Sequence, residues 1–262
     1  MDIFTLFMMQ IHLLIGGTTG AGKSTVIRGI LAAIFSRHPS AVQVVLIDPK
    51  RVELHPYRHA PHVIGYADTP ESMADEIAAA VDIMENRIES MQAAGIRDTD
   101  EPHIYIIIDE LADMMDVCPA DTRRHLKRLL QLGRAAGIHI IAATQHPARK
   151  ILPAELQVNF TALLALPCRS SMESRQIIGI PGAESLAVGT GLYSDPQHRQ
   201  PRRVKIPLTS DADIAAALAR WQQDAPPETP EPQPAAPADT AKPTKKRGFL
   251  ATLIKNLLYP DF

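Results

Sequence analysis

The chain has 262 residues, of which 45% are hydrophobic and 21% are charged, a composition that supports one large α/β domain or one domain with appendages. The formal net charge of -2 excludes a global field that attracts nucleic acid, so any DNA contact must use a local basic surface or channel.

The N-terminal run at residues 3–15 is mostly apolar, but it is too short to span a bilayer and lacks the basic region of a secretion signal. The two cysteines, Cys118 and Cys168, are far apart in sequence and form no metal-binding pattern. We therefore expect a cytoplasmic protein with reduced thiols.

Residues 12–25 are the most informative stretch. A short apolar run predicts a strand at 12–15, and the sequence from Gly17 then reads G-x-x-x-x-G-K-S, the pattern of a phosphate-binding loop. Glycines let successive N–H groups turn around a phosphate, and the helix predicted to start near Lys23 adds the positive end of its dipole. The stretch predicts a nucleotide site in which Lys23 contacts the outer phosphates and Ser24 offers a hydroxyl to Mg²⁺. The candidate binding residues are Gly17, Thr18, Thr19, Gly20, Ala21, Gly22, Lys23, Ser24 and Thr25.

The apolar run at residues 42–47 predicts a strand of a parallel sheet that is covered on both faces. An irregular surface segment is expected to follow over residues 51–66. Three histidines in that segment have a spacing that suggests a metal site, but two prolines interrupt it and no carboxylate or thiol completes a ligand set. We therefore favour a surface segment over a metal site.

Residues 69–95 predict a helix with well-marked ends. Thr69 suits the N-cap, Pro70 suits the first helical position, and Gly95 ends the helix. Apolar residues, several of them methionine, recur between these ends at helical spacing. We expect this stripe to pack in the core rather than to form a binding face.

The remaining elements alternate between strands and helices, which predicts an α/β fold with a mostly parallel central sheet flanked by helices. Strands are predicted at 104–108, 138–143 and 160–166, a strand pair within 187–206 around a turn at 195–197, and helices at about 119–136, stopped by Gly137, at 170–178, and from Ser210 through Trp221.

The composition changes sharply at Ala225. We expect one domain over residues 1–224, a proline-rich disordered linker over 225–244, and a basic, amphipathic tail over 245–262. A basic cluster beside an amphipathic segment can bind a membrane surface or a partner protein. The alternative is a tail that packs back on the domain or frays.

Polar residues at the predicted strand ends complete the candidate site. Because ligands bind where the carboxyl ends of parallel strands meet, Asp48, Asp109, Glu110 and Gln145 are expected beside the phosphate loop. Asp109 suits a carboxylate that holds Mg²⁺ through its water shell, and Glu110 could polarise an attacking water. Gln145 would contact the γ-phosphate or that water, unless it is only a polar strand end.

Several motifs, all in the same order, resemble the motor of the FtsK/SpoIIIE DNA translocases. They are the stretches 12–24, 47–50, 53–54, 61–62, 109–114, 133–139, 143–145, 174–175, 182–186 and 192–194. The resemblance implies a RecA-like P-loop NTPase that binds ATP and Mg²⁺. It also implies assembly as a ring, usually a homo-hexamer, around double-stranded DNA and movement along the DNA by ATP hydrolysis.

The resemblance also implies roles for arginines. Arg134 looks like the arginine finger that reaches the γ-phosphate of a neighbouring subunit, where a planar and permanently charged donor stabilises developing charge. The alternative is one more basic residue on a solvated helix face. Arg175 matches a DNA contact in the pore, with an intrasubunit ion pair as the alternative. Further DNA-binding candidates are Arg169, Arg149 and Lys150.

The DNA-facing stretch departs from the family pattern. His146, Gln157 and Leu163 stand at positions where the family often carries a basic residue. Arg149, Lys150, Arg202 and Arg203 could compensate for part of this lost charge. We predict weaker duplex binding than in typical relatives, or a different nucleic acid in the pore.

The resemblance favours a DNA translocase motor, either a minimal form or a fragment, because the membrane-spanning and winged-helix regions of large family members are missing from this sequence. One alternative is a coupling or packaging ATPase of a mobile element that feeds DNA to a partner complex. The other is a nucleotide-switched assembly protein with little motor activity.

Overall fold

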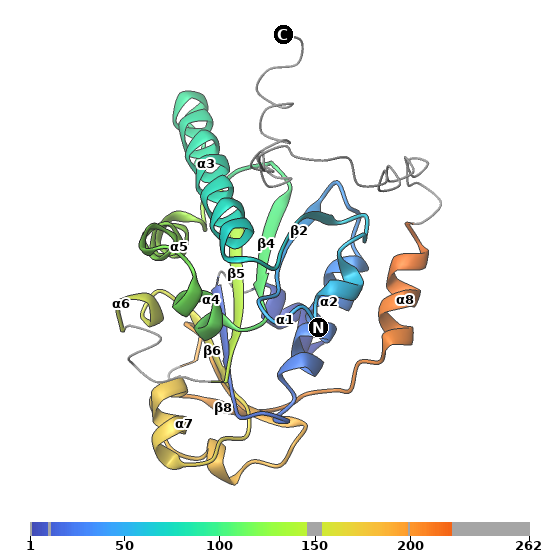
Figure 1. Cartoon of the computed structure of the whole chain (residues 1–262), viewed down its shortest axis with the longest axis vertical. Helices are drawn as coiled ribbons and strands as arrows, with labels where there is room; N and C mark the ends of the chain where they lie inside the picture. The colour runs from blue at the N-terminus through green and yellow to red at the C-terminus, as the bar shows by residue number, and fades with distance from the viewer. Residues whose placement is uncertain (1, 10–11, 146–153, 199, 222–262) are drawn as a thin grey trace, which may run out of the picture.

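A central sheet runs through the computed structural model of the chain, which describes residues 2–9, 12–145, 154–198 and 200–221 (Figure 1). Its eight strands lie in the order β3-β2-β4-β5-β1-β6-β7-β8. All neighbours from β3 to β6 pair in parallel, and β7 and β8 extend the sheet as antiparallel strands. The mostly parallel sheet and the C-terminal strand pair are thus confirmed. The strands are β1 (His12–Gly16), β2 (Val42–Ile47), β3 (Val63–Ala67), β4 (His103–Ile108), β5 (Ile138–Thr144), β6 (Ala162–Ala165), β7 (Thr190–Ser194) and β8 (Arg202–Lys205).

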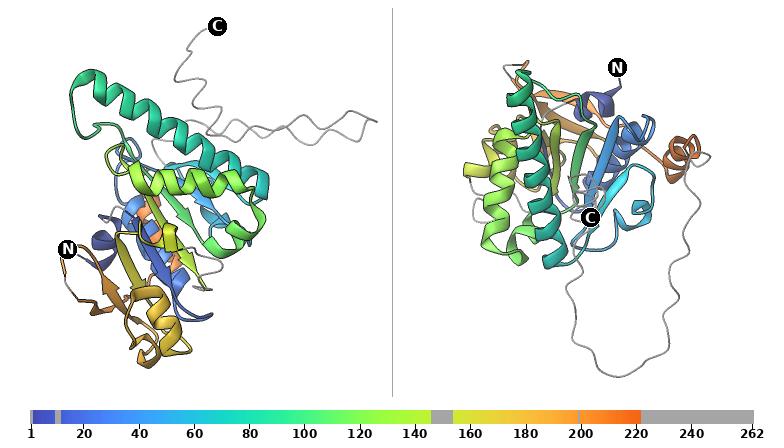
Figure 2. Two further views of the ribbon diagram at one scale, coloured as in Figure 1. Left: turned by 90° about the vertical axis from the view of Figure 1, so that its left-hand side faces the viewer. Right: turned by 90° about the horizontal axis from the view of Figure 1, so that it is seen from above.

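Helices cover both faces of this sheet, with α3, α4 and α5 on one face and α1, α2 and α8 on the other (Figures 1 and 2). The helices are α1 (Ile3–Met8), α2 (Lys23–Phe35), α3 (Pro70–Ala94), α4 (Leu111–Val117), α5 (Ala120–Leu132), α6 (Ala154–Gln157), α7 (Ser171–Ile178) and α8 (Asp211–Ala219), with the short 3-10 helices η1 (His55–Tyr57) and η2 (Ala183–Ser185). Within the described ranges, none of these helices has the length and hydropathy needed to cross a membrane. The predicted linker and tail, together with Arg149 and Lys150, lie outside the described residues.

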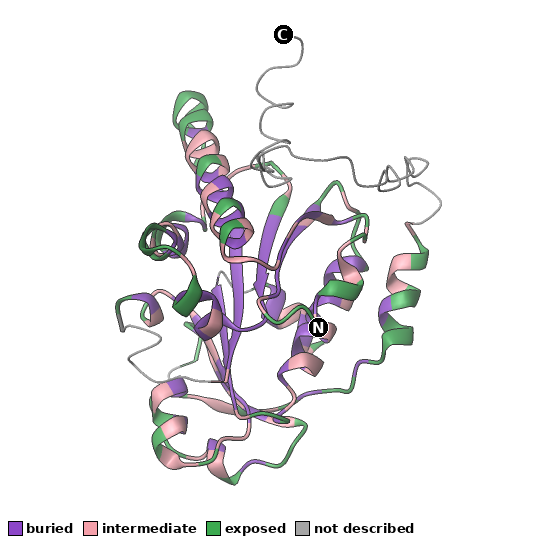
Figure 3. Cartoon of the chain, in the orientation of Figure 1, coloured by how far each residue is buried: buried purple, intermediate pink, exposed green. Residues whose placement is uncertain are grey.

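Strand β4 shows why the strands are apolar at nearly every position. Ile104, Ile106 and Ile108 pack against the helices of one face, while Tyr105 and Ile107 pack against the helices of the other. Because successive side chains point to opposite faces, a strand covered on both sides needs an apolar residue at each position. Figure 3 shows the central strands β1, β2, β4 and β5 as mostly buried, and exposed residues on the outer sides of the helices.

The ends of α3 form as predicted. Thr69 and Ser72 make a reciprocal capping box, Pro70 is the first helical residue, and Gly95 adopts a left-handed φ of 69°. Met73 and Met84 are buried in the core, which confirms that the apolar stripe packs inside the protein.

Strand β3 corrects the prediction of an irregular segment over residues 51–66. Its short run contains Gly65, and a Cβ at this position would lie 2.5 Å from Glu76 Oε2 of α3. The glycine therefore makes room for the Glu76 side chain. A glycine inside a short strand weakens the local pattern, which is why sequence periodicity missed β3.

Helices α1 and α4 were not predicted either. They have 6 and 7 residues, so neither completes two full turns of periodicity. The Asp2 side chain caps α1 by accepting hydrogen bonds from Phe4 N and Thr5 N. Helix α4 begins directly after Glu110, and this keeps the preceding acidic pair at the end of β4.

Helix α5 ends at Leu132 rather than near Ala136 as predicted. Residues 133–137 form a turn, in which Ile138 N donates to Gly133 O at 2.8 Å and Gly137 N donates to Arg134 O at 3.1 Å. Gly137 has the left-handed φ of 67° that this closing pattern requires. The prediction placed Gly137 at the end of the helix, whereas in the structure Gly137 closes the turn that follows the helix. Arg134 therefore lies in the turn and not on the helix.

Candidate functional site

The phosphate loop connects β1 to α2, as the motif predicts. Gly20 and Gly22 have φ values of 76° and 101°, which L side chains rarely adopt, and no atom lies within 4 Å of the place where a Cβ would sit. Backbone conformation, rather than lack of space, therefore requires glycine at both positions. Gly22 is also the N-cap of α2, so Lys23, Ser24 and Thr25 form the first turn of that helix.

Close packing holds the start of the loop in place. A Cβ at Gly16 would lie 2.5 Å from Ile177 Cγ1, and a Cβ at Gly17 would lie 2.8 Å from Leu166 Cβ. Gly17 N donates to Thr144 O at 3.3 Å, and Thr18 uses both its N and its Oγ1 to donate to Pro167 O at 3.1 Å. The loop is thus joined to β5 on one side and to the segment after β6 on the other.

Lys23 points back over the loop. Its side chain is buried, and Nζ donates to Gly17 O at 2.7 Å and to Thr18 O at 2.8 Å. Burial lowers the pKa of this ammonium, and the nearby Glu110 and Asp109 carboxylates oppose that effect. The lysine therefore lies between the loop and the acidic pair, where it can contact the oxygens of a bound phosphate.

Asp109 lies at the end of β4 and is buried. Burial, followed by the negative charges of Asp48, Glu53 and Glu110, raises the pKa of Asp109 to about 7, against the opposing charge of Lys50. The structure has therefore gathered excess negative charge beside the phosphate loop. A cation bound here would offset that charge.

The oxygen atoms at this edge fit a magnesium ion. Asp48 Oδ2 accepts hydrogen bonds from Leu54 N and His55 N, while Asp48 Oδ1 is buried and has no hydrogen-bond partner among the described residues. Carboxylate and hydroxyl oxygens are the ligands that Mg²⁺ prefers, and Mg²⁺ usually keeps several waters. Asp109 and the Ser24 hydroxyl remain the predicted metal-binding groups at this edge, and a bound Mg²⁺ would supply positive charge against the phosphates.

Glu110 joins the acidic pair to β5. Its carboxylate is fully buried and accepts from Gln145 N at 3.0 and 3.1 Å. The Gln145 side chain in turn accepts a hydrogen bond from Thr19 Oγ1 at 2.7 Å. A continuous set of contacts therefore links the phosphate loop, the end of β5 and Glu110, and the predicted convergence of these residues is present.

Lys50 was not among the predicted site residues. Its Nζ lies 3.5 Å from Glu110 Oε2 and 3.3 Å from Asp113 Oδ2. Burial lowers the pKa of Lys50, but the Glu110 and Asp113 carboxylates outweigh it and leave the pKa raised. A signal was available, because Lys50 follows β2 and therefore lies at the same edge as Asp48.

Arg134 lies at the opposite edge of the sheet. It precedes β5, while Gln145 follows β5, so the seven residues of that strand, at about 3.3 Å each, separate the two edges by roughly 20 Å. The Arg134 side chain is exposed and has no hydrogen bond or ion pair within the described part of the chain. It cannot reach the phosphate loop of its own subunit.

Two of the predicted DNA contacts, Arg169 and Arg175, lie beside and on α7, and the structure brings this helix next to the phosphate loop through Ile177 and Gly16. Arg169 and Arg175 are both exposed, and Arg175 Nη1 lies 3.5 Å from Ser171 Oγ. No ion pair to Arg175 is found among the described residues, so its intrasubunit alternative has no support.

One departure from the family pattern, Gln157, and one candidate for compensation, Arg202, have structural roles. Gln157 Nε2 donates to Gln176 O at 2.6 Å and to Ile177 O at 3.3 Å, so it satisfies carbonyls at the end of α7. Arg202 lies 3.6 Å from Asp195 Oδ2, whose side chain is buried, and its guanidinium lies over the Tyr193 ring. Arg202 therefore makes its contacts within the β7–β8 region. This leaves Arg203 as the freer of these two arginines to compensate for the lost charge.

Comparison with known proteins identifies relatives at the level of sequence. The FtsK/SpoIIIE family model matches residues 3–103 and 97–149. The DNA translocase FtsK of Mycobacterium tuberculosis is 35% identical over 90% of this chain and 31% of its own length. The DNA translocase SftA of Bacillus subtilis is 36% identical over 82% of this chain and 24% of its own length. The chain thus spans about a third or less of these relatives.

Solved structures with the same fold are more distant in sequence. ATPases 2 and 3 of EssC from Geobacillus thermodenitrificans align with a TM-score of 0.70 at 21% identity, over 86% of this chain and 46% of that one. The pCW3 conjugation coupling protein TcpA aligns with a TM-score of 0.68 at 20% identity, over 81% of this chain and 65% of that one. At these identities the likeness shows a shared fold.

Proposed function

The chain belongs to the FtsK/SpoIIIE family, and from that premise we propose that it is an ATP-dependent DNA translocase motor that acts as a ring of identical subunits. One observation carries this proposal. The phosphate loop and the acidic pair are gathered at one edge of the sheet, while Arg134 is exposed and unpaired within the described residues at the other edge. A site divided in this way is complete only where two subunits meet.

The proposed hydrolysis assigns one task to each side chain. Residues 17–25 bind the triphosphate, with Lys23 beside the outer phosphates. Glu110 polarises the attacking water, and Gln145 reports the presence or loss of the γ-phosphate through its contact with Thr19. Arg134 of the neighbouring subunit donates to the charge that develops in the transition state.

The proposed DNA contacts are supported by their position beside the loop. Pro167 O accepts two hydrogen bonds from Thr18, and the same segment continues into Arg169 and α7. A change in the loop during turnover therefore has a short path to Arg169 and Arg175. Arg149 and Lys150 remain predicted contacts, and double-stranded DNA remains the proposed partner.

The remaining proposals concern the rest of the chain. We propose a homo-hexameric ring of domains over residues 1–224, the linker 225–244, and a tail at 245–262 that docks on a partner protein or a membrane surface. We also propose that the motor works in the cytoplasm.

The decisive experiment measures ATPase rate with and without long duplex DNA. Wild type should hydrolyse ATP with Mg²⁺ and turn over faster with DNA, while Lys23→Ala should lose at least about a hundred-fold because it removes the ammonium beside the phosphates. Lys205→Ala, an exposed lysine on β8, is the matched control and should be unaffected. Mass measurement with a non-hydrolysable ATP analogue tests the ring, and a protein that stays monomeric and hydrolyses nothing would overturn the proposal.

A second candidate, a nucleotide-switched assembly protein, is favoured by Gln157. This residue stands where the family often carries a basic side chain, and its amide is used to bind α7. An ATPase rate that duplex DNA does not stimulate would support this candidate over the motor.

A coupling or packaging ATPase is distinguished from a free translocase by deleting residues 248–262. The free translocase should keep both its DNA-stimulated ATPase and its activity in cells. The coupled enzyme should keep the first and lose the second.

A further inference from the structure

The turn that carries Arg134 is held from outside as well as from within. Its own closing bonds join Ile138 N to Gly133 O and Gly137 N to Arg134 O. The three carbonyls that follow Arg134 each accept from a different segment. Thr99 N donates to Ala135 O at 3.2 Å, Arg87 Nη1 donates to Ala136 O at 2.8 Å, and Ile104 N donates to Gly137 O at 2.9 Å.

Arg87 is the one side chain among these three donors. It comes from α3, and its second nitrogen, Nη2, donates to Pro102 O at 2.9 Å. The guanidinium therefore bridges two backbone segments, residues 133–137 and the residues just before β4. A planar fork with fixed donors suits two carbonyls at once, whereas an ammonium cannot reproduce that geometry.

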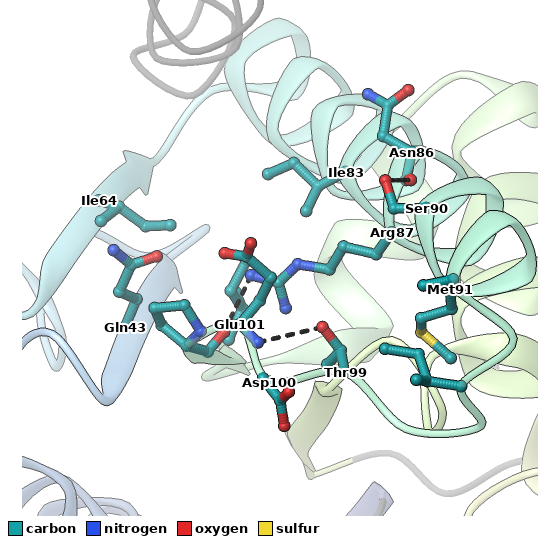
Figure 4. Close-up of a pocket in the computed structure, with 14 residues that line it drawn as sticks. Gln43, Ile64, Ile83, Asn86, Arg87, Ser90, Met91, Thr99, Asp100 and Glu101 are labelled. Carbon is teal, nitrogen blue, oxygen red and sulfur yellow. Dashed lines mark hydrogen bonds between the residues drawn. The ribbon is translucent and has the colours of Figure 1, made fainter.

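The surroundings of Arg87 leave the two carbonyls as its main fixed contacts. It lies along a cavity of about 500 Å³ between α3 and residues 96–104, where Figure 4 shows its side chain reaching from the helix toward Thr99 and Glu101. No ion pair to Arg87 is found among the described residues, although the charge of Glu101 acts on it.

We propose that Arg87 is a positioning residue that holds the Arg134 turn in the geometry needed to reach a neighbouring subunit's nucleotide. The inference rests on the proposed function, because it assumes that Arg134 acts across a subunit boundary. Arg87 touches neither nucleotide nor DNA in this account. Its effect passes through Ala136 O, which lies in the same turn as Arg134 and two residues after it.

Kinetics give the first test. Arg87→Met keeps most of the side-chain length but removes both hydrogen bonds. We expect kcat for ATP to fall about ten-fold while KM changes by less than about two-fold, because misplacing a catalytic group by a fraction of an ångström costs turnover rather than binding. Arg87→Lys should recover only part of the loss. An unchanged kcat, or a full recovery with lysine, would overturn the inference.

Mixed rings give the sharper test, because they separate the two halves of the divided site. Lys23→Ala subunits can offer only Arg134, and Arg134→Ala subunits can offer only the phosphate loop, so mixing the two should restore ATPase. Adding Arg87→Met to the Lys23→Ala subunits should lower the restored rate about ten-fold. Adding it to the Arg134→Ala subunits should change the rate by less than two-fold.

A general loss of folding would weaken both mixtures equally, and that result would overturn the inference. Arg128→Met is the matched control, since Arg128 joins α5 to Glu85 of α3 through an exposed ion pair without touching the turn. It should leave both mixtures unchanged. If Arg87→Met fails to fold, Arg87→Lys is used in the same mixtures, with the same asymmetry expected. If mixing Lys23→Ala and Arg134→Ala subunits restores no ATPase activity, the proposal of a site shared between subunits is wrong, and so is this inference.

Discussion

The two edges of the same sheet differ in how their charged groups are held. At the carboxyl edge, Glu110 and Asp109 are buried, and Glu110 contacts both Lys50 and Gln145. At the amino edge, Arg134 is exposed on a turn whose backbone is held by hydrogen bonds, and its side chain makes no hydrogen bond or ion pair with the described residues. The carboxyl edge is a half-site, by which we mean a set of charged groups already held in place. The amino edge presents one donor, Arg134, on a fixed turn.

This difference gives a physical reason for the proposed ring. Buried negative charges at the carboxyl edge are costly unless a cation offsets them. A free guanidinium at the amino edge gains most when it enters such a low-dielectric site, because charge interactions are stronger there than in water. Joining the two edges of adjacent subunits satisfies both requirements, which supports a ring.

The largest effect on the difference between the two edges is expected from removing Arg134. Arg134→Ala should lower turnover by about 10³-fold, the effect expected of an arginine finger, while nucleotide binding to the carboxyl edge stays unchanged. Steady-state ATPase and equilibrium binding of a fluorescent nucleotide check the two parts. Arg123→Ala, an exposed arginine on α5, is the control, and an equal loss of binding and turnover would contradict the division of the site.

The charge at the carboxyl edge can be tested through its pH dependence. The pKa of Asp109 is raised from 3.8 to about 7, so the native state binds its proton more tightly than the unfolded state does. Stability from this group is therefore present at low pH and is lost as pH rises through about 7. Without Mg²⁺, Asp109→Asn should be more stable than wild type by up to roughly 4 kcal/mol near pH 8, since the shift spans about three pKa units and each unit is worth about 1.4 kcal/mol.

Urea unfolding between about pH 4 and pH 8 measures this difference. The advantage of Asp109→Asn should shrink as pH falls from about 7 toward 4, because protonation of Asp109 then removes the buried negative charge from the native state. Asp116→Asn, in which the carboxylate is exposed on α4, is the control and should show no such trend. An advantage that does not vary with pH would mean that folding does not raise the pKa of Asp109.

Lys50 tests whether the buried half-site needs its own cation. Lys50→Met removes the charge that faces Glu110 and Asp113, so turnover should fall about ten-fold through a misplaced Glu110. The same change removes a charge that opposes the raised pKa of Asp109, so the pH below which Asp109 is protonated should rise. A pH–rate profile of Lys50→Met beside wild type measures both effects, and an unshifted profile would contradict this role.

The smallest expected effect concerns the surface beside α7. Arg175→Ala should reduce the slope of log affinity against log salt by about one, because one phosphate contact is lost. ATPase without DNA should be unchanged. Filter-binding titrations against wild type measure the slope, and a wild-type slope near -6 or steeper would refute our prediction that this chain binds duplex DNA more weakly than its relatives.

Sequence patterns predicted the elements whose signals are local and long. The phosphate loop, α3 with its capping box and glycine end, and the apolar strands of the parallel sheet are all present. The patterns missed α1, α4 and β3 because each is short, and in β3 the glycine at position 65 makes room for Glu76 of the following helix, which no local pattern records. They also extended α5 too far, since the bonds that hold residues 133–137 come from α3 and from the segment before β4.

By itself, the sequence determined the chemistry of this protein: the phosphate loop, the acidic pair, the polar strand end and the arginine are each readable from residue type and spacing. The strand ends also predicted that the phosphate loop meets the acidic pair and Gln145. Only the tertiary structure decided the remaining contacts. It joins Lys50 to Glu110 across two strands and Arg87 to Ala136 across 49 positions. It also separates Arg134 from the loop by the length of β5. The physical reason is that strand order and helix packing arise from burial of apolar surface over the whole chain, which no local pattern records.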